Sequence, residues 1–281
     1  MAINMARQLR SILLAIFLVL LPIHTYAAAW LQPKGQGLVI GNLQQYVACN
    51  YWDQQSQLQK SGACFNQFSF SPYVEYGLLS KLTAVVSPNF NSFHQANDSV
   101  PFGFENIFVA GRYLLWEKDW SALSVQLGYN QPIRRSTFGN PLIPTSTFVL
   151  INRQSYIDAR LLYGTGGTLD PAKENTWYAD FEGSFQPNFN GAADEFHLNM
   201  MLGLKTHGGR LIFELQEFNS IRCNNPKNIT FPNYNLFTVM PNVIYWYKEN
   251  VAAIQLGVYQ DFFGTNIGRG TTPFVSLWWR F

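Results

Sequence analysis

Charged side chains are scarce in this sequence. Asp, Glu, Lys and Arg together make up 13% of its 281 residues, against ~25% in an ordinary soluble domain. After the first 29 residues, the sequence also lacks an apolar run of the ~20 residues that a transmembrane helix needs. Hydrophobic residues nevertheless account for 47% of the chain and aromatic residues for 16%. This composition is typical of a transmembrane β-barrel, whose strands carry apolar residues in alternation with polar ones.

Two further absences limit the functions that the chain can have. The sequence contains no GxSxG, HExxH or paired His–carboxylate metal spacing, so we expect neither an enzyme nor a cofactor. It also lacks an excess of positive charge. Its 19 basic residues fall to 17 when Arg7 and Arg10 are removed with the amino-terminal segment, which equals its 17 acidic residues. A neutral protein presents no electrostatic surface for nucleic acid, which we do not expect as a partner.

Residues 1–29 have the three parts of a secretory signal peptide. Arg7 and Arg10 supply the positive region, residues 12–21 are uninterruptedly apolar, and the alanines at 27–29 are small enough for a cleavage site. The apolar stretch is too short for a retained membrane anchor. We therefore expect residues 1–29 to be cleaved on export and residues 30–281 to form a single domain. Residues 30–37 are predicted to be a polar, turn-rich lead-in to the first strand.

The sequence has three cysteines. Export would bring them into an oxidising compartment, where disulfides form. Cys49 and Cys64 flank a polar segment that we expect to be a loop, and a bond between them would stabilise it by about 3 kcal/mol in the chain-entropy description. Cys223 is then left over, but its pairing with either of the others stays open.

The last ten residues, 272–281, carry the clearest barrel signal. At period two, Trp279 and Phe281 fall on one apolar face, while Arg280 falls on the other. An exposed edge strand with an apolar face would aggregate in water. In a closed barrel this strand pairs with the first one and its apolar face meets lipid. A terminal aromatic residue resembles the assembly signal of bacterial outer-membrane barrels, which implies the barrel-assembly machinery and outer-membrane lipid as partners, with Trp279 and Phe281 as the signal.

Alternation predicts an all-β fold, a closed antiparallel transmembrane β-barrel of about twelve strands. Ten or fourteen strands remain possible. The tight turns at 78–81, 117–119, 206–210 and 248–250 share one end, and aromatic residues gather at the strand ends beside them, as in an interfacial girdle. We therefore place these turns in the periplasm and the longer loops outside. The expected strands are residues 38–48, 65–77, 82–93, 104–116, 120–130, 155–164, 176–186, 194–205, 211–218, 236–247, 251–261 and 272–281.

Two stretches carry a family resemblance. Residues 29–37, Ala-Trp-Leu-Gln-Pro-Lys-Gly-Gln-Gly, and residues 71–83, Ser-Pro-Tyr-Val-Glu-Tyr-Gly-Leu-Leu-Ser-Lys-Leu-Thr, resemble outer-membrane barrels of the XagA-like and MetA-pathway phenol-degradation-type group. The resemblance covers little more than these stretches and includes no catalytic motif. It implies an outer-membrane location and a barrel architecture, and it leaves the solute unidentified.

The polar faces of the strands predict the side chains that line the lumen. Seven acidic residues against four basic ones make this expected interior acidic, and we predict a cation preference if the barrel conducts. A plug of paired side chains is about as well supported as an open pore, because twelve strands lie between small filled barrels and large porins. The predicted lining is Glu75, Arg112, Asp158, Arg160, Asp180, Glu182, Glu195, His197, Lys205, Glu214, Asp261 and Arg280.

His197 is the residue with the most catalytic character. Asn199 and Glu195 share its face, but a barrel lipase would hold its Ser–His pair on the lipid-facing wall. His94 is predicted in a loop, His207 in a turn, and the run 164–167 in another turn because no helix follows it. We interpret His197 as a polar residue of the lumen.

The predicted function is a passive pore for small polar or aromatic solutes in the outer membrane of a Gram-negative bacterium. The alternative is a non-conducting barrel that displays extracellular loops for adhesion or envelope integrity. The loop at 131–153 contains Phe138, Leu142, Ile143 and Phe148. These apolar residues would suit a lumen constriction, a cover over the rim or contact with a partner, and the sequence does not choose among the three.

Overall fold

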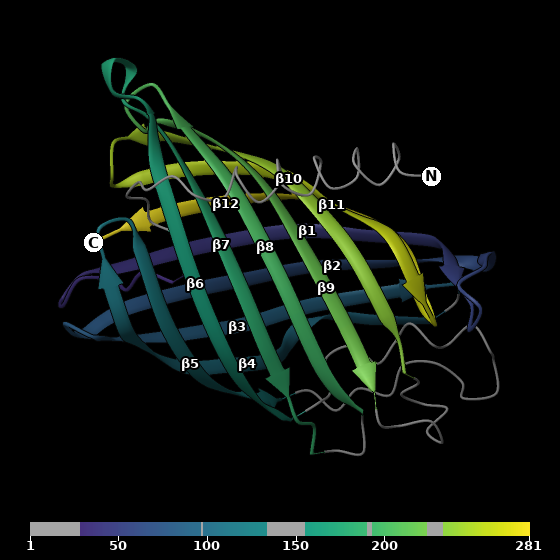
Figure 1. Ribbon diagram of the computed structural model, residues 1–281. Coiled ribbons are helices and arrows are strands. Elements are labelled where there is room, and N and C mark those ends of the chain that lie inside the picture. The colour runs from purple at the N-terminus through teal and green to yellow at the C-terminus, as the bar shows by residue number, and fades with distance from the viewer. Residues whose placement is uncertain (1–28, 97, 134–154, 190–192, 224–232) are drawn as a thin grey trace, which may run out of the picture.

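The computed structural model describes residues 29–96, 98–133, 155–189, 193–223 and 233–281 as a closed antiparallel β-barrel (Figure 1). Each strand pairs with its neighbours in sequence, and β12 pairs with β1 to close the sheet. The prediction of twelve strands is confirmed. The strands are β1 (Gly37–Trp52), β2 (Leu58–Leu79), β3 (Leu82–Gln95), β4 (Asp98–Lys118), β5 (Ser121–Pro132), β6 (Tyr156–Asp170), β7 (Asn175–Gln186), β8 (Asp194–Thr206), β9 (Leu211–Cys223), β10 (Asn235–Lys248), β11 (Ala252–Thr265) and β12 (Ile267–Arg280).

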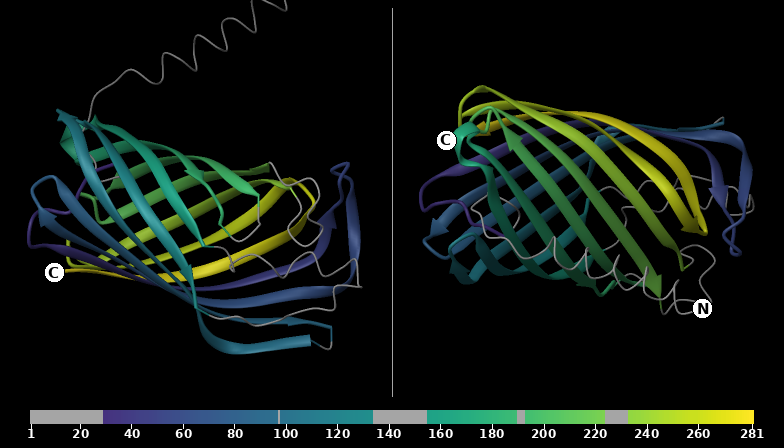
Figure 2. Two further views of the ribbon diagram at one scale, coloured as in Figure 1. Left: turned by 90° about the horizontal axis from the view of Figure 1, so that it is seen from below. Right: turned by 45° about the horizontal axis from the view of Figure 1, so that its top comes forward.

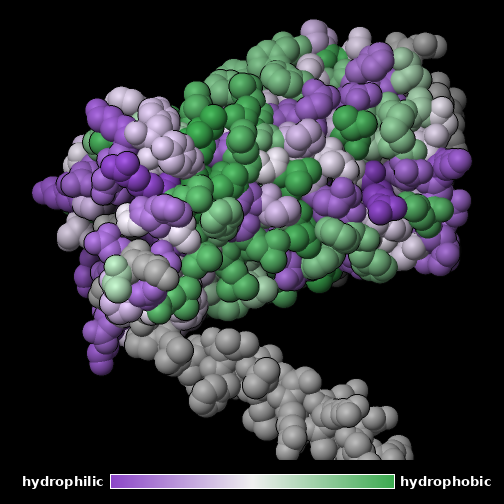
Figure 3. Space-filling view, turned by 90° about the horizontal axis from the view of Figure 1, so that it is seen from above, coloured by the Kyte–Doolittle hydropathy of each residue, from purple (hydrophilic) through white to green (hydrophobic). Residues whose placement is uncertain are grey.

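Alternation along each strand separates an apolar outer face from a polar inner face. In β5, Val125, Leu127 and Tyr129 are exposed on the outside, while Ser124 and Gln126 are buried inside. On the face shown in Figure 3, apolar residues gather across the middle of the barrel, and polar residues are frequent towards its two ends. A barrel with such a band meets the requirement of a lipid bilayer, which is an apolar solvent for the outer wall.

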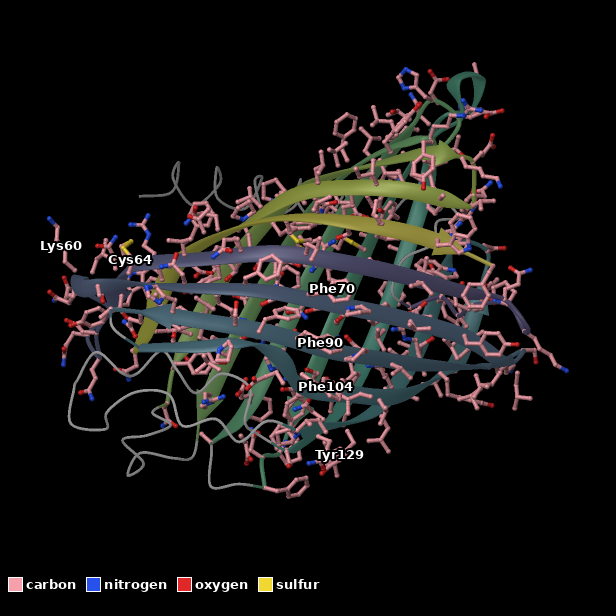
Figure 4. All side chains as sticks on the ribbon, turned by 180° about the vertical axis from the view of Figure 1, so that it is seen from behind. Lys60, Cys64, Phe70, Phe90, Phe104 and Tyr129 are labelled. Carbon is pink, nitrogen blue, oxygen red and sulfur yellow. A yellow bond between two sulfur atoms is a disulfide. The ribbon has the colours of Figure 1, made fainter. Side chains whose placement is uncertain are left out.

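The outer band includes a row of aromatic rings that crosses three neighbouring strands. Phe70 on β2, Phe90 on β3 and Phe104 on β4 follow one another (Figure 4), with ring centroids 6.1 and 5.1 Å apart. Cross-strand aromatic pairs of this kind stabilise the sheet beyond their burial and fix the register of the strands.

The two ends of the barrel differ. At the end that we call the turn end, β2–β3, β4–β5, β8–β9 and β10–β11 are joined by tight turns, several with residues in the left-handed region, such as Asp119 and Asn250. The β6–β7 connection there contains a short 3-10 helix, η2 (Pro171–Lys173), capped by the side chain of Asp170. The carboxyl terminus also lies at the turn end (Figures 1 and 2). The opposite end is the loop end.

Barrel closure depends on the carboxyl terminus. The backbones of Gly37 and Phe281 exchange two hydrogen bonds, of 2.8 and 3.0 Å. A Cβ at Gly37 would overlap the Phe281 ring, so glycine permits this close approach. Phe281 also stacks on Tyr76 across the seam, at 6.4 Å between centroids. Trp279 and Phe281 remain half-exposed on the outer wall.

Several strands are longer at the loop end than the alternation predicts. The segment 49–64, expected to be a loop, is instead the end of a β-hairpin, with a turn around Asp53 that projects beyond neighbouring strands (Figure 2). Cys49 and Cys64 form a disulfide across it, with Cα atoms 4.1 Å apart. The loop assignment of His94 is likewise wrong, because His94 lies in β3. The segment 49–64 consists mostly of polar residues, so an alternation of apolar residues does not reveal it.

The turn predicted at 164–167 is also wrong. Gly164 and Gly166 lie within β6, paired with Asp180 and Tyr178 of β7. Of the expected signal peptide, residues 1–29, all but Ala29 lie outside the described residues. Residues 134–153 and 224–232 of the two long predicted loops also lie outside them.

Candidate functional site

The lumen is the candidate site, and it contains a cavity of about 760 Å³. All twelve lining residues predicted from the sequence lie on strands, at positions that face inward and are buried or half-buried. Eight of them line the cavity, while Glu195, His197, Lys205 and Asp261 lie elsewhere on the inner wall. The eight are Glu75, Arg112, Asp158, Arg160, Asp180, Glu182, Glu214 and Arg280.

One charged cluster joins β2, β4 and β5. Arg112 forms an ion pair with Glu75 at 2.9 Å, and both side chains are more than nine-tenths buried. The Tyr73 hydroxyl donates to Glu75 at 2.6 Å, and the Arg112 guanidinium donates to the Tyr73 oxygen and to Gln126, both at 3.1 Å. Each charge in this cluster therefore has an opposite charge and a neutral hydrogen-bond partner, as buried ion pairs require.

A second cluster joins β6 to β8. The Arg160 guanidinium contacts the Asp158 and Glu182 carboxylates, each at 2.7 Å. Gln186 donates to Asp158 at 3.0 Å, and Asn199 donates to Glu182 at 3.5 Å. One cation thus holds two carboxylates on the wall, so their negative charge is partly compensated.

A third cluster lies towards the loop end of β8 and β9. Arg222 forms an ion pair with Glu195, and both are buried. The Tyr234 hydroxyl donates to the other Glu195 oxygen at 3.0 Å. Arg222 is a lumen residue that the sequence analysis missed, because β9 was expected to end at Phe218. With it, five bases stand against the seven predicted acids, and both Glu182 and Glu195 are paired.

His197 lies beside this third cluster and also contacts a serine. Its Nε2 is 3.1 Å from the Gln186 amide oxygen and 3.4 Å from Glu195. An amide oxygen only accepts, so Nε2 carries the proton, and Nδ1 accepts from the Ser220 hydroxyl at 2.9 Å. Ser220 and His197 are direct cross-strand partners. Because Arg222 and Tyr234 already hold the Glu195 carboxylate, we interpret the contacts as a cross-strand polar network.

Two other inner carboxylates and two cations contact neutral or aromatic groups. The Tyr178 hydroxyl donates to Glu214, and Thr238 donates to Asp261 at 2.6 Å. The Lys205 ammonium lies 5.3 Å from the Tyr178 ring centroid, and the Arg280 guanidinium lies 4.5 Å from that of Trp246. Cations over aromatic faces are stabilised by the ring quadrupole.

The wall formed by β9 to β12 carries a chain of aromatic rings beside the cavity. Phe218, Tyr259 and Phe274 form a chain of rings with centroids 5.8 and 5.1 Å apart, and Met240 lies beside them in the lining. A Cβ at Gly257 would overlap the Phe274 ring, so this glycine lets the ring lie flat against the wall. Strands six apart face each other across a closed barrel of twelve. The aromatic wall therefore faces the wall of β4 to β6 that carries Arg112 and Arg160.

The amino-terminal segment of the expected mature chain, residues 30–36, also enters the lumen. Trp30, Gln32 and Gln36 line the cavity together with strand residues. The sequence predicted only a turn-rich lead-in here. The signal that the segment enters the lumen lies far along the chain, in an inward-facing glycine of β6 described below.

The described residues contain no cluster of three or more His, Cys, Asp or Glu side chains that would hold a metal ion. Within the same residues, no helix is long and apolar enough to cross a membrane.

Comparison with solved structures identifies the same fold. The COG4313 outer membrane channel from Pseudomonas putida F1 aligns over 92% of this chain and 99% of its own, with a TM-score of 0.67 and 11% sequence identity. The KdgM porin aligns over 85% and 98%, with a TM-score of 0.44 and 6% identity. The translocator domain of the autotransporter NalP from Neisseria meningitidis aligns over 89% of this chain and 90% of its own, with a TM-score of 0.43 and 12% sequence identity. No family model and no curated protein matches the sequence. The similarity to the COG4313 channel shows a shared closed-barrel architecture.

Proposed function

We propose that the protein is a passive outer-membrane channel for small solutes that combine a polar group with an aromatic or apolar part. The observation that carries this proposal is the lumen, where a cavity of about 760 Å³ lies between a charged, hydrogen-bonding wall and an aromatic wall. A cavity of this size is within the range that small-molecule sites occupy in proteins.

The outer wall supports the membrane location. Its apolar band suits lipid, and exposed aromatic residues such as Tyr245 and Tyr247 stand near the turn end, where an interfacial girdle would lie. The resemblance of residues 29–37 and 71–83 to XagA-like and MetA-pathway phenol-degradation-type barrels favours the same location. In this arrangement the turn end faces the periplasm and the loop end faces outward.

The two walls also support the solute class. Rings stack on aromatic side chains with offset or edge-to-face geometry, so the chain of Phe218, Tyr259 and Phe274 would favour a solute with a ring. The opposite wall offers donors and acceptors already fixed by the ion pairs. Since most of the lumen charge is paired, we infer that net charge on the solute matters less than its shape.

A liposome-swelling assay with matched variants tests the proposal. Vesicles containing the purified protein should swell in isotonic arabinose and in isotonic phenylalanine, and protein-free vesicles should not. Phe274→Ala, which shortens the aromatic wall, should slow phenylalanine entry relative to arabinose. Leu277→Ala on the outer face of the same strand should leave that ratio unchanged. Folded protein that produces no swelling in either solute would refute the channel.

One observation favours the second candidate function, a non-conducting barrel whose loops serve adhesion or envelope integrity. The lumen contains ion-paired side chains and an inserted chain segment, which are features of a filled barrel. Folded protein that admits no solute, together with loss of cell adhesion or envelope integrity on deletion of the gene, would place this candidate first.

A further inference from the structure

Two cations lie side by side at the loop end, on either side of a neutral residue. Asn50 of β1 is the direct cross-strand partner of Lys60 on β2 and of Arg269 on β12. Directly opposite residues project from the same face of a sheet. Because neighbouring strands are about 4.8 Å apart, the backbones of Lys60 and Arg269 are separated by about 10 Å, with Asn50 between them. We call these three residues the cationic row.

The cationic row belongs to the outer face of the barrel. Along β12, Gly268 and Gly270 are buried, whereas Arg269 is exposed together with Thr271. Lys60 is also exposed, and it lies near the disulfide at the loop end (Figure 4). The two cations therefore meet the surroundings of the barrel and not its lumen.

The height of the cationic row matches the level of lipid head groups. Gly37 of β1 lies at the turn end, where Tyr76 and Phe281 stack on the outer wall. Asn50 follows Gly37 by 13 residues along the same strand. At about 3.3 Å per residue and a strand tilt of about 45°, this separation is about 30 Å along the barrel axis. Since the apolar band of an outer-membrane barrel is about 25 Å tall, the row lies just beyond it.

Both cations are available to an external anion. Within the described residues, neither Lys60 nor Arg269 forms an ion pair. The Arg269 guanidinium lies 6.0 Å from the ring centroid of Trp52, a contact that orients the cation and leaves its charge uncompensated. The acid at the hairpin tip, Asp53, accepts hydrogen bonds from two backbone amides of its own turn and from the Gln59 side chain. Its carboxylate is therefore held by neutral donors.

The β1–β2 hairpin that carries the row is fixed in place. The Cys49–Cys64 disulfide bridges its two strands next to the row. At the tip, the Asn266 amide donates to the Asp53 carbonyl at 3.1 Å, which ties the hairpin to the β11–β12 turn. A fixed arrangement of charges loses little conformational entropy when a ligand binds.

We propose that the cationic row binds the phosphate groups of lipopolysaccharide in the outer leaflet. Lys60 and Arg269 contact phosphate oxygens, and the Asn50 side-chain amide donates between them. The acyl chains lie along the outer face of β1, where Leu43 and Val47 are exposed. A lipid suits this surface better than a free anion, because it uses both the charges and the apolar wall below them. The inference rests on the outward orientation of the loop end given with the proposed function.

The test is the affinity of the purified full chain, in detergent, for lipid A, the phosphorylated lipid part of lipopolysaccharide. Wild type, Lys60→Gln, Arg269→Gln and the double variant are compared, each shown to be folded by heat-modifiable gel mobility. We expect the Kd to rise about fivefold for each single variant and about 25-fold for the double, as for cations at an anionic lipid surface. The matched control is the Lys118→Gln/Lys248→Gln double variant, which removes the same charge from exposed positions at the turn end. This control should bind lipid A as wild type does.

Two further ligands separate the lipid from other anions. Dephosphorylated lipid A should bind wild type and the double variant equally weakly, and inorganic phosphate at millimolar concentration should not displace lipid A. Equal affinities of wild type and the double variant for lipid A would overturn the proposal. Displacement by inorganic phosphate would reassign the row to a free anion and overturn the lipid as its ligand. Binding is measured without conduction, so this result is independent of the channel proposal.

Discussion

Replacement of Arg160 by glutamine tests how charge is compensated in the lumen. Arg160 contacts both Asp158 and Glu182, each at 2.7 Å. Its removal takes this group from a net charge of −1 to −2, while the glutamine retains a hydrogen-bonding side chain of similar length. The variant should therefore be less stable and more cation-selective than wild type.

The magnitudes follow from the geometry. Breaking a fully buried ion pair costs about 3–5 kcal/mol. The Arg160 side chain is 23% exposed to the lumen, so solvent screening reduces the expected loss of unfolding free energy to about 2 kcal/mol. One uncompensated charge attracts a cation 4 Å away by about 1 kcal/mol in water. Since 1.4 kcal/mol corresponds to a factor of ten, the cation-over-anion permeability ratio should rise about fivefold.

The assay combines denaturant unfolding of the folded barrel with reversal potentials in a salt gradient. The control is Arg210→Gln, because the Arg210–Glu249 pair is longer, at 3.5 Å, and more than half exposed. This control should change neither quantity measurably. The gain in selectivity should disappear at 1 M salt, where the Debye length is about 3 Å. An Arg160→Gln variant with unchanged selectivity at low salt would refute the claim that this cluster faces the conducting path.

Three further outcomes are expected. Deletion of Phe281, which removes its backbone bonds to Gly37 and its stack on Tyr76, should abolish most heat-modifiable barrel, and wild-type amounts would contradict its role as an assembly signal. A tag inserted after residue 55, in the β1–β2 turn, should be labelled on intact cells, whereas a tag after residue 249 should not, and the reverse pattern would invert the orientation. Replacing the disulfide-bonded Cys49 with serine should cost at most about 3 kcal/mol, so the barrel should still fold, with faster proteolysis of the β1–β2 hairpin as the readout.

Period-two alternation was sufficient to predict the barrel. Each strand in the apolar band must place one face in an apolar solvent and the other in a polar lumen. Apolar and polar residues therefore alternate along its sequence. That constraint ends where the strands leave the band. For this reason the sequence analysis placed Arg222 in a loop. It therefore missed the ion pair between Arg222 and Glu195. The sequence analysis therefore counted Glu195 as an unpaired acid, because its partner lies beyond the alternating region.

The amino-terminal segment was beyond prediction for a different reason. Its Pro-Lys-Gly turn was visible, but nothing in residues 30–36 specifies where the residues before the turn lie. The destination is set by Gly164, whose missing side chain makes room for the Trp30 ring. Read locally, Gly164 and its glycine neighbours indicated a turn, since glycine usually marks one. In the barrel these glycines form part of β6. At Gly164 the lack of a side chain lets the distant Trp30 ring pack against the strand.

The central claim is that solutes and ions pass through this barrel. The most direct measurement is the single-channel conductance of the purified wild-type chain in a planar bilayer, with a heat-denatured sample of the same preparation as control. The account predicts discrete conductance steps from the folded sample, with only a weak cation preference, and none from the denatured one. Electrical silence from folded wild-type protein would contradict it.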